Sequence, residues 1–299
     1  MIKFAEKTIE NWPEYCAEVQ PRQERGWVYR GQAGVAARLQ TTLERACATW
    51  GVPLDNAPRV EKGLMREFRR RYDRADVLEV RSDKLYCLAM MRHYGAPARL
   101  LDFTYSPYIA GYFALKAHTG TLPPAHHDEG IEEGCVWGIR GGWLTDAAGK
   151  IVGEDIITQR NTDRSRCDAS FYAAYEKEPR KSFVFSENPL FLGGNVRLVQ
   201  QQGVFLCPGD VKRPFLDNLG SMPGADDPEN AIVFRFRMTL GARCQSLDTM
   251  YRHGLNEGNL FPDLDGFARQ LSMRVRFLGQ ASLQGTGERE EYTRGPGTR

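Results

Sequence analysis

The stretch HYGAPARLLDFTYSPYIAGYFAL, residues 93–115, carries the clearest fold signals of the chain. Gly95 predicts the end of a preceding helix, because a glycine after a helix permits the turn that stops it. Residues 98–103 are largely apolar and predict a buried strand. Ser106 and Pro107 predict the start of a second helix, since the hydroxyl caps free backbone amides and proline suits the first helical position. A strand therefore passes almost directly into an aromatic helix.

Further helices and strands are predicted on both sides of this stretch. Ser82 is the expected N-cap of the helix that ends near His93, and apolar spacing predicts another helix over residues 58–72. Segments rich in β-forming residues predict strands at residues 26–32, 135–140, 196–206, 231–238 and 273–278.

The C-terminal region is expected to change character along its length. Residues 260–271 predict a turn followed by a helix that Asp263 or Asp265 caps. The elements together predict a single domain over residues 1–278, including an N-terminal extension. Residues 279–299 show no apolar periodicity, and their composition predicts a disordered tail.

The composition is that of an ordinary globular protein, with 41% hydrophobic and 26% charged residues among 299. No apolar run approaches the roughly 20 residues that span a bilayer. The first residues, MIKFAEKTIENW, lack the apolar segment of a signal peptide, so we expect a cytoplasmic protein without membrane contact. The seven cysteines form no C-x-x-C pair, and the adjacent His126 and His127 cannot readily share one metal ion. Neither a disulfide framework nor a metal site is expected.

Arginine dominates the basic residues. Of the 40 Lys and Arg residues 31 are Arg, although the net charge is only +2. Either a GC-rich genome raises the Arg content, or Arg forks serve to bind phosphate and carboxylate groups. The predicted helix at residues 58–72 contains an arginine cluster, Arg66, Arg69 and Arg70. This cluster is either a solvated face of the helix or a phosphate-binding strip. The net charge alone does not indicate a nucleic-acid-binding protein.

Several familiar catalytic signatures are absent from the sequence. In GGWLTDAAGK, residues 141–150, no glycine lies five positions before Gly149 and Ile follows the Lys, so the segment is not a P-loop. There is no G-x-G-x-x-G after a strand, no H-E-x-x-H and no G-x-S-x-G. P-loop, Rossmann, zinc-protease and α/β-hydrolase chemistry is therefore not expected.

Three predicted strands end in polar residues that a core would not select. These strand ends are residues 29–32 (YRGQ), residues 102–106 (DFTYS) and residues 200–203 (QQQG). Each lies near a Gly or Pro that permits a tight backbone approach. Such ends lie at the rim of a sheet, where ligands commonly bind.

These stretches resemble the FRG domain family, which is named for a Phe/Tyr-Arg-Gly motif, here Tyr29-Arg30-Gly31. The other family-like stretches are LMREF (64–68), HYGAPARLLDFTYSPYIAGYFAL (93–115), NVRLVQQQGVF (195–205) and NLFPDLDGFARQL (259–271). The resemblance spans residues 26–272, and its five motifs occur in the family's order. The family label by itself implies no particular chemistry.

A second, weaker resemblance does concern chemistry. The order of the three polar strand ends is similar to the arginine, serine and glutamate trio of mono-ADP-ribosyltransferases. This resemblance implies an α+β fold with a split, mostly antiparallel sheet around a cleft and helices packed outside it. Arg30 would hold the phosphates and nicotinamide ribose of NAD, Thr104 would brace the pocket, and Gln201 would stand where that fold keeps its catalytic Glu. The cofactor-binding residues that it implies are Tyr29, Gly31, Gln32, Asp102, Ser106 and Tyr112.

The glutamine is a departure from that pattern. Gln201 can hydrogen-bond to a ribose but brings no charge to the positive sugar that forms as nicotinamide leaves. Either another acid serves, with Glu67, Asp102 and Asp263 as candidates, or the domain binds its ligand without catalysis. His93 can act as a base or simply pack at the end of its helix.

The polar residues also have structural interpretations. Arg30 can form a structural ion pair with Asp102, Thr104 and Ser106 can serve only to cap a helix, and the glutamines at 200–202 can decorate an edge strand. A purely structural role for all of them predicts no nucleotide-sized cleft beside Arg30.

The resemblance favours an NAD-dependent ADP-ribosyltransferase that acts with inversion at the sugar. We expect a bacterial toxin or phage-defence effector that modifies RNA, DNA or protein, with RNA preferred over DNA, and that has an antitoxin or chaperone partner. The alternative is a non-catalytic module that senses NAD or ADP-ribose through the same pocket.

Overall fold

The computed structural model describes residues 4–23, 26–32, 34, 38–116, 134–162, 168–187, 196–226, 233–238, 243–271 and 275. The expected loop with His126 and His127 and the expected tail at residues 279–299 lie outside these ranges.

A mostly antiparallel sheet organises the chain. Its strands are β1 (Ala5–Ile9), β2 (Trp27–Gln32), β3 (Leu101–Thr104), β4 (Gly134–Arg140), β5 (Val184–Glu187), β6 (Gly203–Pro208) and β7 (Val233–Met238). Their order across the described part of the sheet is β1-β7-β4-β2-β3-β6-β5. Every neighbouring pair is antiparallel except β1 and β7, which are parallel. The predicted α+β class with a mostly antiparallel sheet is confirmed.

The sheet has a weak seam between its fourth and fifth strands, β2 and β3. Strand β2 pairs with β4 through six residue pairs, and β3 pairs with β6 through four. Strands β2 and β3, however, pair only at Tyr29 and Thr104. Because the backbones share a single registered pair, side chains can enter between the two halves of the sheet. We call this place the β2/β3 seam.

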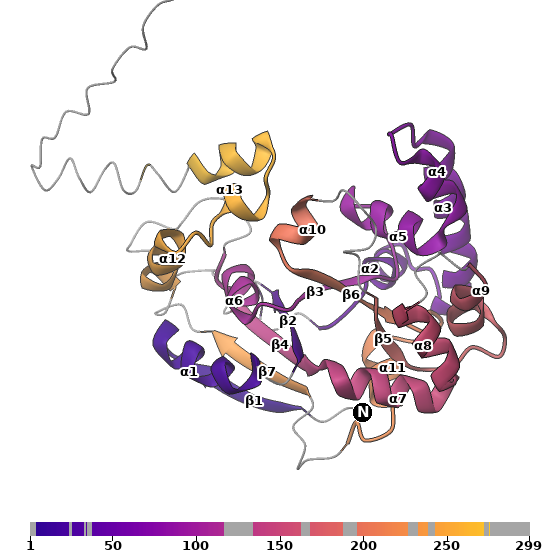
Figure 1. Cartoon of the computed structure of the whole chain (residues 1–299), viewed down its shortest axis with the longest axis horizontal. Coiled ribbons are helices and arrows are strands. Elements are labelled where there is room, and N and C mark those ends of the chain that lie inside the picture. Colours follow the sequence, from indigo (N-terminus) through magenta and orange to yellow (C-terminus); the bar gives the residue numbers. More distant parts are fainter. Residues whose placement is uncertain are drawn as a thin grey trace, which may run out of the picture.

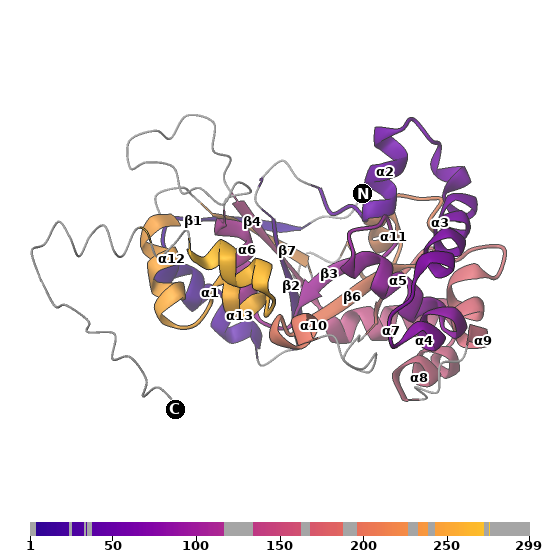
Figure 2. The ribbon, with the colours of Figure 1, turned by 90° about the horizontal axis from the view of Figure 1, so that it is seen from above.

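Helices cover both faces of the sheet (Figures 1 and 2). The helices are α1 (Trp12–Gln23), α2 (Thr42–Thr49), α3 (Ala57–Arg71), α4 (Val77–Ser82), α5 (Lys84–His93), α6 (Pro107–Leu115), α7 (Gly141–Val152), α8 (Glu154–Thr162), α9 (Asp168–Phe171), α10 (Val196–Gln200), α11 (Phe215–Gly220), α12 (Arg243–Arg252) and α13 (Glu257–Leu260). Residues 264–271 are also helical. A 3-10 turn (Leu54–Asn56) precedes α3, and a π-helix (Tyr172–Glu176) follows α9.

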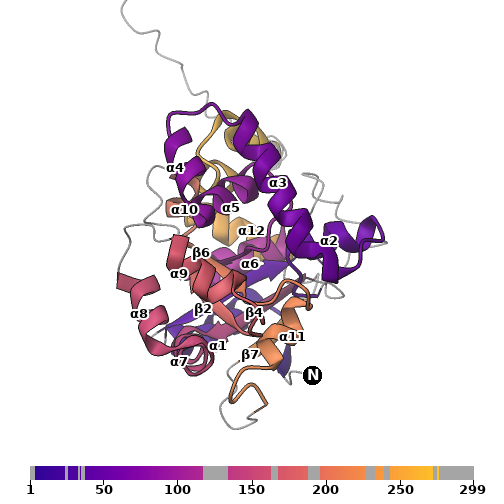
Figure 3. The ribbon, with the colours of Figure 1, turned by 90° about the vertical axis from the view of Figure 1, so that its right-hand side faces the viewer.

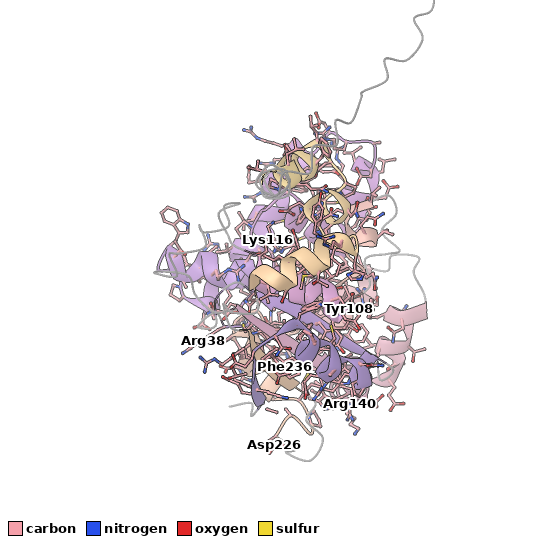
Figure 4. All side chains as sticks on the ribbon, turned by 90° about the vertical axis from the view of Figure 1, so that its left-hand side faces the viewer. Arg38, Tyr108, Lys116, Arg140, Asp226 and Phe236 are labelled. Carbon is pink, nitrogen blue, oxygen red and sulfur yellow. The ribbon has the colours of Figure 1, made fainter. Side chains whose placement is uncertain are left out.

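Two large apolar clusters hold the helices to the sheet. One cluster joins α1, α6 and α12 to strands β2, β4 and β7. The other joins α3, α5, α7 and α11 to the opposite face of β2 and β4 and to strands β3, β5 and β6. In the first cluster the Tyr15 ring lies edge-on to Phe236, and its hydroxyl donates to the Pro107 backbone oxygen at 2.6 Å. Figure 4 labels Phe236 within this cluster. Together these contacts fix the position of α6 across β2 and β4.

Helix α6 approaches the sheet closely because the facing residues are small. A Cβ atom on Gly31 of β2 would lie only 1.9 Å from the Ala110 backbone oxygen, and one on Gly134 of β4 would lie 2.0 Å from that of Ala114. Only glycine fits at these two points. The glycine that follows Arg30 therefore has a packing role, since it lets the strand lie against the helix.

The start of α6 follows the prediction. Ser106 has an extended backbone and its Oγ accepts a hydrogen bond from the Ile109 amide at 3.3 Å, while Pro107 occupies the first turn. Gly95 has φ +81°, a left-handed conformation that glycine adopts without strain, and it follows α5 as expected. The predicted strand at 26–32 and the helix at 58–72 are likewise confirmed.

Two predicted elements differ from the structure. Ser82 is not the cap of α5: it ends α4, and its hydroxyl donates to the Leu78 oxygen, whereas Asp83 Oδ1 accepts from the Tyr86 amide. Residues 196–206 are not one strand. They form α10, a turn in which Gln202 has φ +45°, and only then β6.

The apolar alternation of residues 196–206 misled the strand prediction, because tertiary contacts decide its first half. Leu198 packs where Gly203 leaves space, and the Gln201 side-chain amide donates to the Leu260 backbone oxygen at 3.0 Å. The predicted strand at 273–278 lies outside the described residues except for Val275, which is helical.

A buried ion pair ties α3 to the chain just before β3. The Arg99 Nε donates to both carboxylate oxygens of Glu61, at 2.9 and 3.0 Å, and both side chains are almost fully buried. The Arg99 guanidinium also lies over the Phe171 ring. The carboxylate of Glu61 raises the pKa of Arg99 against the opposing effect of burial. Arg99 therefore stays charged inside the core.

Candidate functional site

A cavity of about 230 Å³ lies at the β2/β3 seam. Its walls come from both strands, from α5, α6 and α10, and from β6. Six of the residues that the sequence predicts for a ligand site line this cavity: Tyr29, Arg30, Gly31, Asp102, Thr104 and Gln201. The three predicted catalytic residues thus share one hollow, although they come from separate parts of the chain.

The other three predicted binding residues do not line the cavity. Gln32 lies one step further along β2, where its Nε2 donates to the Arg38 backbone oxygen. The Ser106 hydroxyl caps α6. Tyr112 packs in the apolar cluster that joins α1, α6 and α12 to the sheet, where burial and the nearby Glu257 raise its pKa.

Arg30 is the most unusual of the lining residues. Its side chain is 15% exposed, and Nη1 donates to the Asp102 backbone oxygen at 2.7 Å. Its Nε is buried and has no hydrogen-bond partner among the described residues. Burial lowers the pKa of Arg30 to about 10, a shift that Arg92 and Arg45 assist and that Asp102 opposes. The guanidinium is therefore a buried cation with too little negative charge around it.

The carboxylate of Asp102 accepts its hydrogen bonds from a different arginine, Arg92. Arg92 of α5 donates to Asp102 Oδ2 through Nε at 2.8 Å and through Nη2 at 2.5 Å. The distance from Arg30 Nη1 to the same oxygen is 3.7 Å. Arg30 and Asp102 do form an ion pair, but a single carboxylate serves both arginines.

Thr104 and Gln201 connect the two sides of the cavity. The Thr104 hydroxyl donates to the Gln201 backbone oxygen at 2.8 Å and accepts from the Ser106 amide at 3.0 Å. The Gln201 Nε2 donates to the Leu260 backbone oxygen. The side-chain carbonyl oxygen of Gln201 is then available as a neutral acceptor beside the cavity. Both residues therefore hold strand β3, α10 and α13 in place as well as line the hollow.

The three candidate carboxylates lie in different surroundings. Glu67 is 61% exposed on α3 and pairs with Arg70 at 3.2 Å. Asp263 Oδ1 accepts from the Gly266 amide at 2.6 Å, which makes Asp263 the cap of the helix at residues 264–271, as one of the predictions had it. Of the three, Asp102 alone lines the cavity.

Sequence reasoning missed two cations that complete the site. Arg92 and Arg197 line the cavity together with Arg30, and His93 lies beside them. Burial and the charge of Arg92 lower the pKa of Arg197, and burial and Arg197 lower the pKa of His93. Arg197 lies inside the family-like stretch at residues 195–205, and Arg92 directly precedes the one at residues 93–115. Arg197 escaped notice because its segment was expected to be a strand rather than α10.

The site is suited to an anion that brings its own aromatic or apolar part. Three guanidinium groups face one carboxylate, and the remaining wall includes the rings of Phe113 and Phe205. Bidentate guanidinium groups match phosphate and carboxylate oxygens. Among the described residues no group of three or more His, Cys, Asp and Glu side chains could hold a metal ion.

Among the residues that the structure describes, no helix is both long enough and apolar enough to cross a bilayer.

Comparison with curated proteins and with solved structures yields no match. A match does come from the family described as the FRG domain, whose model covers residues 25–121, less than half of the chain. This range includes β2 with Tyr29-Arg30-Gly31, helices α2 to α6 and strand β3, and so supplies most of the cavity wall. Residues 25–121 are thus similar to the FRG domain, and the resemblance drawn from the Tyr29-Arg30-Gly31 motif is confirmed over this part of the chain.

Proposed function

We propose that the chain binds NAD at the β2/β3 seam and acts as an NAD-dependent ADP-ribosyltransferase. The observation that carries this proposal is the convergence of Arg30, Thr104 and Gln201 on one cavity. A hydrogen bond joins Thr104 to Gln201 across 97 positions of sequence, and another joins Arg30 to Asp102 across 72. The order of these three residues in the sequence does not by itself require them to meet in the fold.

The residues present fit the phosphate-bearing part of a dinucleotide. The buried Nε of Arg30 lacks an acceptor among the described residues, and a phosphate oxygen would supply one. Arg92 and Arg197 add two further cations. The cavity of about 230 Å³ is smaller than the 300–1,000 Å³ typical of small-molecule sites. It therefore encloses one part of NAD, and the remainder lies outside its mouth.

Each side chain has a definite task under this proposal. When bound, NAD supplies the ADP-ribosyl group and nicotinamide as the leaving group. Arg30 and Arg197 bind phosphate oxygens, and Phe113 offers an apolar surface to the ring. The neutral Gln201 carbonyl would accept from a ribose hydroxyl, and Asp102, the one acidic residue among the described lining residues, would face the positive charge of the sugar. Electrostatic help from Asp102 is reduced, because Arg92 already neutralises it.

The acceptor that we propose is nucleic acid, with RNA preferred over DNA, or protein. Support for nucleic acid comes from the Arg-rich face of α3, where Arg66 and Arg70 are more than 60% exposed. Exposed guanidinium groups can both pair with phosphate and stack on bases.

A non-catalytic NAD or ADP-ribose sensor is the second candidate. One observation favours it: among the described residues Asp102 is the only acidic residue lining the cavity, and two arginines already contact it. A site that must stabilise a positive sugar would gain from a free carboxylate. A binding site for phosphate groups has no such need.

The experiment that separates the candidates uses NAD labelled with ³²P in its adenylate phosphate. Purified protein is incubated with labelled NAD and, in turn, cellular RNA, DNA or protein, and free nicotinamide is measured in the same samples. The transferase proposal predicts label in one fraction and an equal amount of nicotinamide, both lost in Arg30→Gln. Lys150→Gln, an exposed change on α7, is the matched control.

Three outcomes are decisive. Label incorporation that Arg30→Gln and Gln201→Ala both leave unchanged would contradict the assigned site. Tight NAD binding without nicotinamide release would support the sensor. Neither binding nor release would reject both candidates.

A further inference from the structure

A second, larger hollow differs in chemical character from the cavity at the β2/β3 seam. It is an open groove of about 1,450 Å³ along α3, bounded by the start of α5 and the π-helix. Figure 3 looks onto this side of the molecule, with α3, α4 and α5 in view. Of its sixteen lining residues nine are Lys or Arg and two are Glu. We call it the α3 groove.

Both acidic residues of the α3 groove are already engaged. Glu61 forms the buried ion pair with Arg99. Glu176 lies 2.6 Å from the ammonium group of Lys84. Glu67, which pairs with Arg70 on the same helix, does not line the groove. Arg66 also pairs with Glu67, and Arg180 pairs with Glu178. Among the described residues, four of the nine lining cations form no ion pair with a carboxylate: Arg59, Lys62, Arg69 and Arg81.

Three cations are particularly exposed to an incoming ligand. Arg59, Lys62 and Arg81 are exposed, and none of them forms an ion pair within the described part of the chain. Nearby, Arg69 Nε donates to the Val80 backbone oxygen, while its buried Nη2 finds no acceptor among the described residues. The chain as a whole carries a net charge of only +2. Such a local excess of positive charge raises the concentration of anions at that surface.

The length of the groove favours a polyanion over a single phosphate group. Helix α3 has 15 residues, which corresponds to roughly 22 Å at 1.5 Å per residue. One nucleic acid strand carries a phosphate about every 3.4 Å along a duplex axis, so roughly six phosphates span this length. An isolated phosphate group would leave some of the four cations without a carboxylate partner, Arg59, Lys62, Arg69 and Arg81, still unpaired. A strand would engage many of them at once.

We propose that the α3 groove binds a nucleic acid strand through its phosphate backbone. Arg59, Lys62 and Arg81 pair with phosphate oxygens, and the groove reads charge and spacing rather than base sequence. This binding needs no NAD and does not rest on the proposed transferase activity. Loss of one can therefore be observed without loss of the other.

The test measures binding by fluorescence anisotropy with fluorescein-labelled 20-nucleotide single strands of RNA and of DNA, at several NaCl concentrations and without NAD. The groove variant is Arg59→Gln/Lys62→Gln/Arg81→Gln. The control variant is Lys150→Gln/Arg213→Gln/Arg252→Gln, which removes the same charges from exposed residues outside the groove. Circular dichroism melts check that both variants fold, and the single exposed change Lys62→Glu provides an independent variant.

The wild type and the control variant are expected to bind alike, with affinity that falls steeply with salt. The groove variant is expected to bind roughly tenfold or more weakly, and the slope of log affinity against log salt should decrease by about 2, since each contact with a single strand contributes about 0.7. Tighter binding of RNA than of DNA would identify 2′-hydroxyl contacts, and equal binding would identify phosphate contacts alone. Equal losses in the two triple variants, no binding by the wild type, or binding of poly-glutamate as tight as that of either strand would overturn the proposal.

Discussion

Arg30 of β2 donates a hydrogen bond from Nη1 to the backbone oxygen of Asp102 on β3, at 2.7 Å. This bond crosses the β2/β3 seam, where the two strands otherwise share one registered pair. It uses only one of the five donors of the guanidinium, and Nε remains buried without an acceptor among the described residues. The arginine therefore closes the seam while it keeps donors available for an anion.

The first prediction concerns Gly31, which follows this arginine. We expect Gly31→Ala to lower the free energy of unfolding by about 3 kcal/mol or more, because the new Cβ would overlap the Ala110 backbone oxygen. Backbone cannot rotate away as a side chain can. Urea denaturation followed by circular dichroism measures the change.

Gly63 provides the control for this change. Its added Cβ would meet nothing within 4 Å, and it lies inside α3, where alanine is favoured over glycine. Gly63→Ala should therefore raise the free energy of unfolding by about 0.5–1 kcal/mol. Similar effects of the two substitutions would refute the packing role of Gly31.

The second prediction concerns the buried pair of Glu61 and Arg99. Glu61→Gln leaves the Arg99 charge unpaired in the core and should cost about 3–5 kcal/mol of stability. The double variant Glu61→Leu/Arg99→Met buries no charge, so it should be destabilised by clearly less than the sum of Glu61→Leu and Arg99→Met. Urea denaturation of the four proteins gives this coupling energy. Additive effects would show that the pair contributes little.

The third prediction concerns pH and His93. Burial and the charge of Arg197 hold the pKa of His93 below its usual value, although Asp263 opposes this. Below about pH 6.5 the unfolded chain binds this proton more readily than the folded protein does, so folding stability must fall as the pH falls. His93→Gln should reduce the loss of stability between pH 7.5 and pH 5.5, measured by urea denaturation. An unchanged loss would show that His93 does not titrate differently on folding.

Local signals were enough to predict several elements of the fold. Ser106 and Pro107 mark the start of α6, and Gly95 the end of α5, because each acts through the backbone within one helical turn. Strand β2 was predicted from its own β-forming residues. Motif order indicates residues 29–31 as site residues, but it does not indicate which other residues lie beside them.

Long-range contacts decided what the sequence could not reveal. Residues 196–200 have the apolar alternation of a strand, yet packing against α13 and β6 makes them helical, and this brings Arg197 to the cavity. Arg92 was missed because nothing local to α5 indicates that its partner is Asp102, ten residues later on β3. The single-pair seam between β2 and β3 depends on the pairing of both strands with their other neighbours.

The most direct test of the account is isothermal titration calorimetry of NAD with the wild type, Arg30→Gln and the exposed control Lys150→Gln, after thermal melts confirm that all three are folded. We predict that NAD binds the wild type and the control with equal affinity. Arg30→Gln should bind at least tenfold more weakly, since a hydrogen bond to a charged group contributes about 1.5–3 kcal/mol. Equal affinity in all three proteins, or no NAD binding by the folded wild type, would contradict the assignment of the β2/β3 seam as the NAD site.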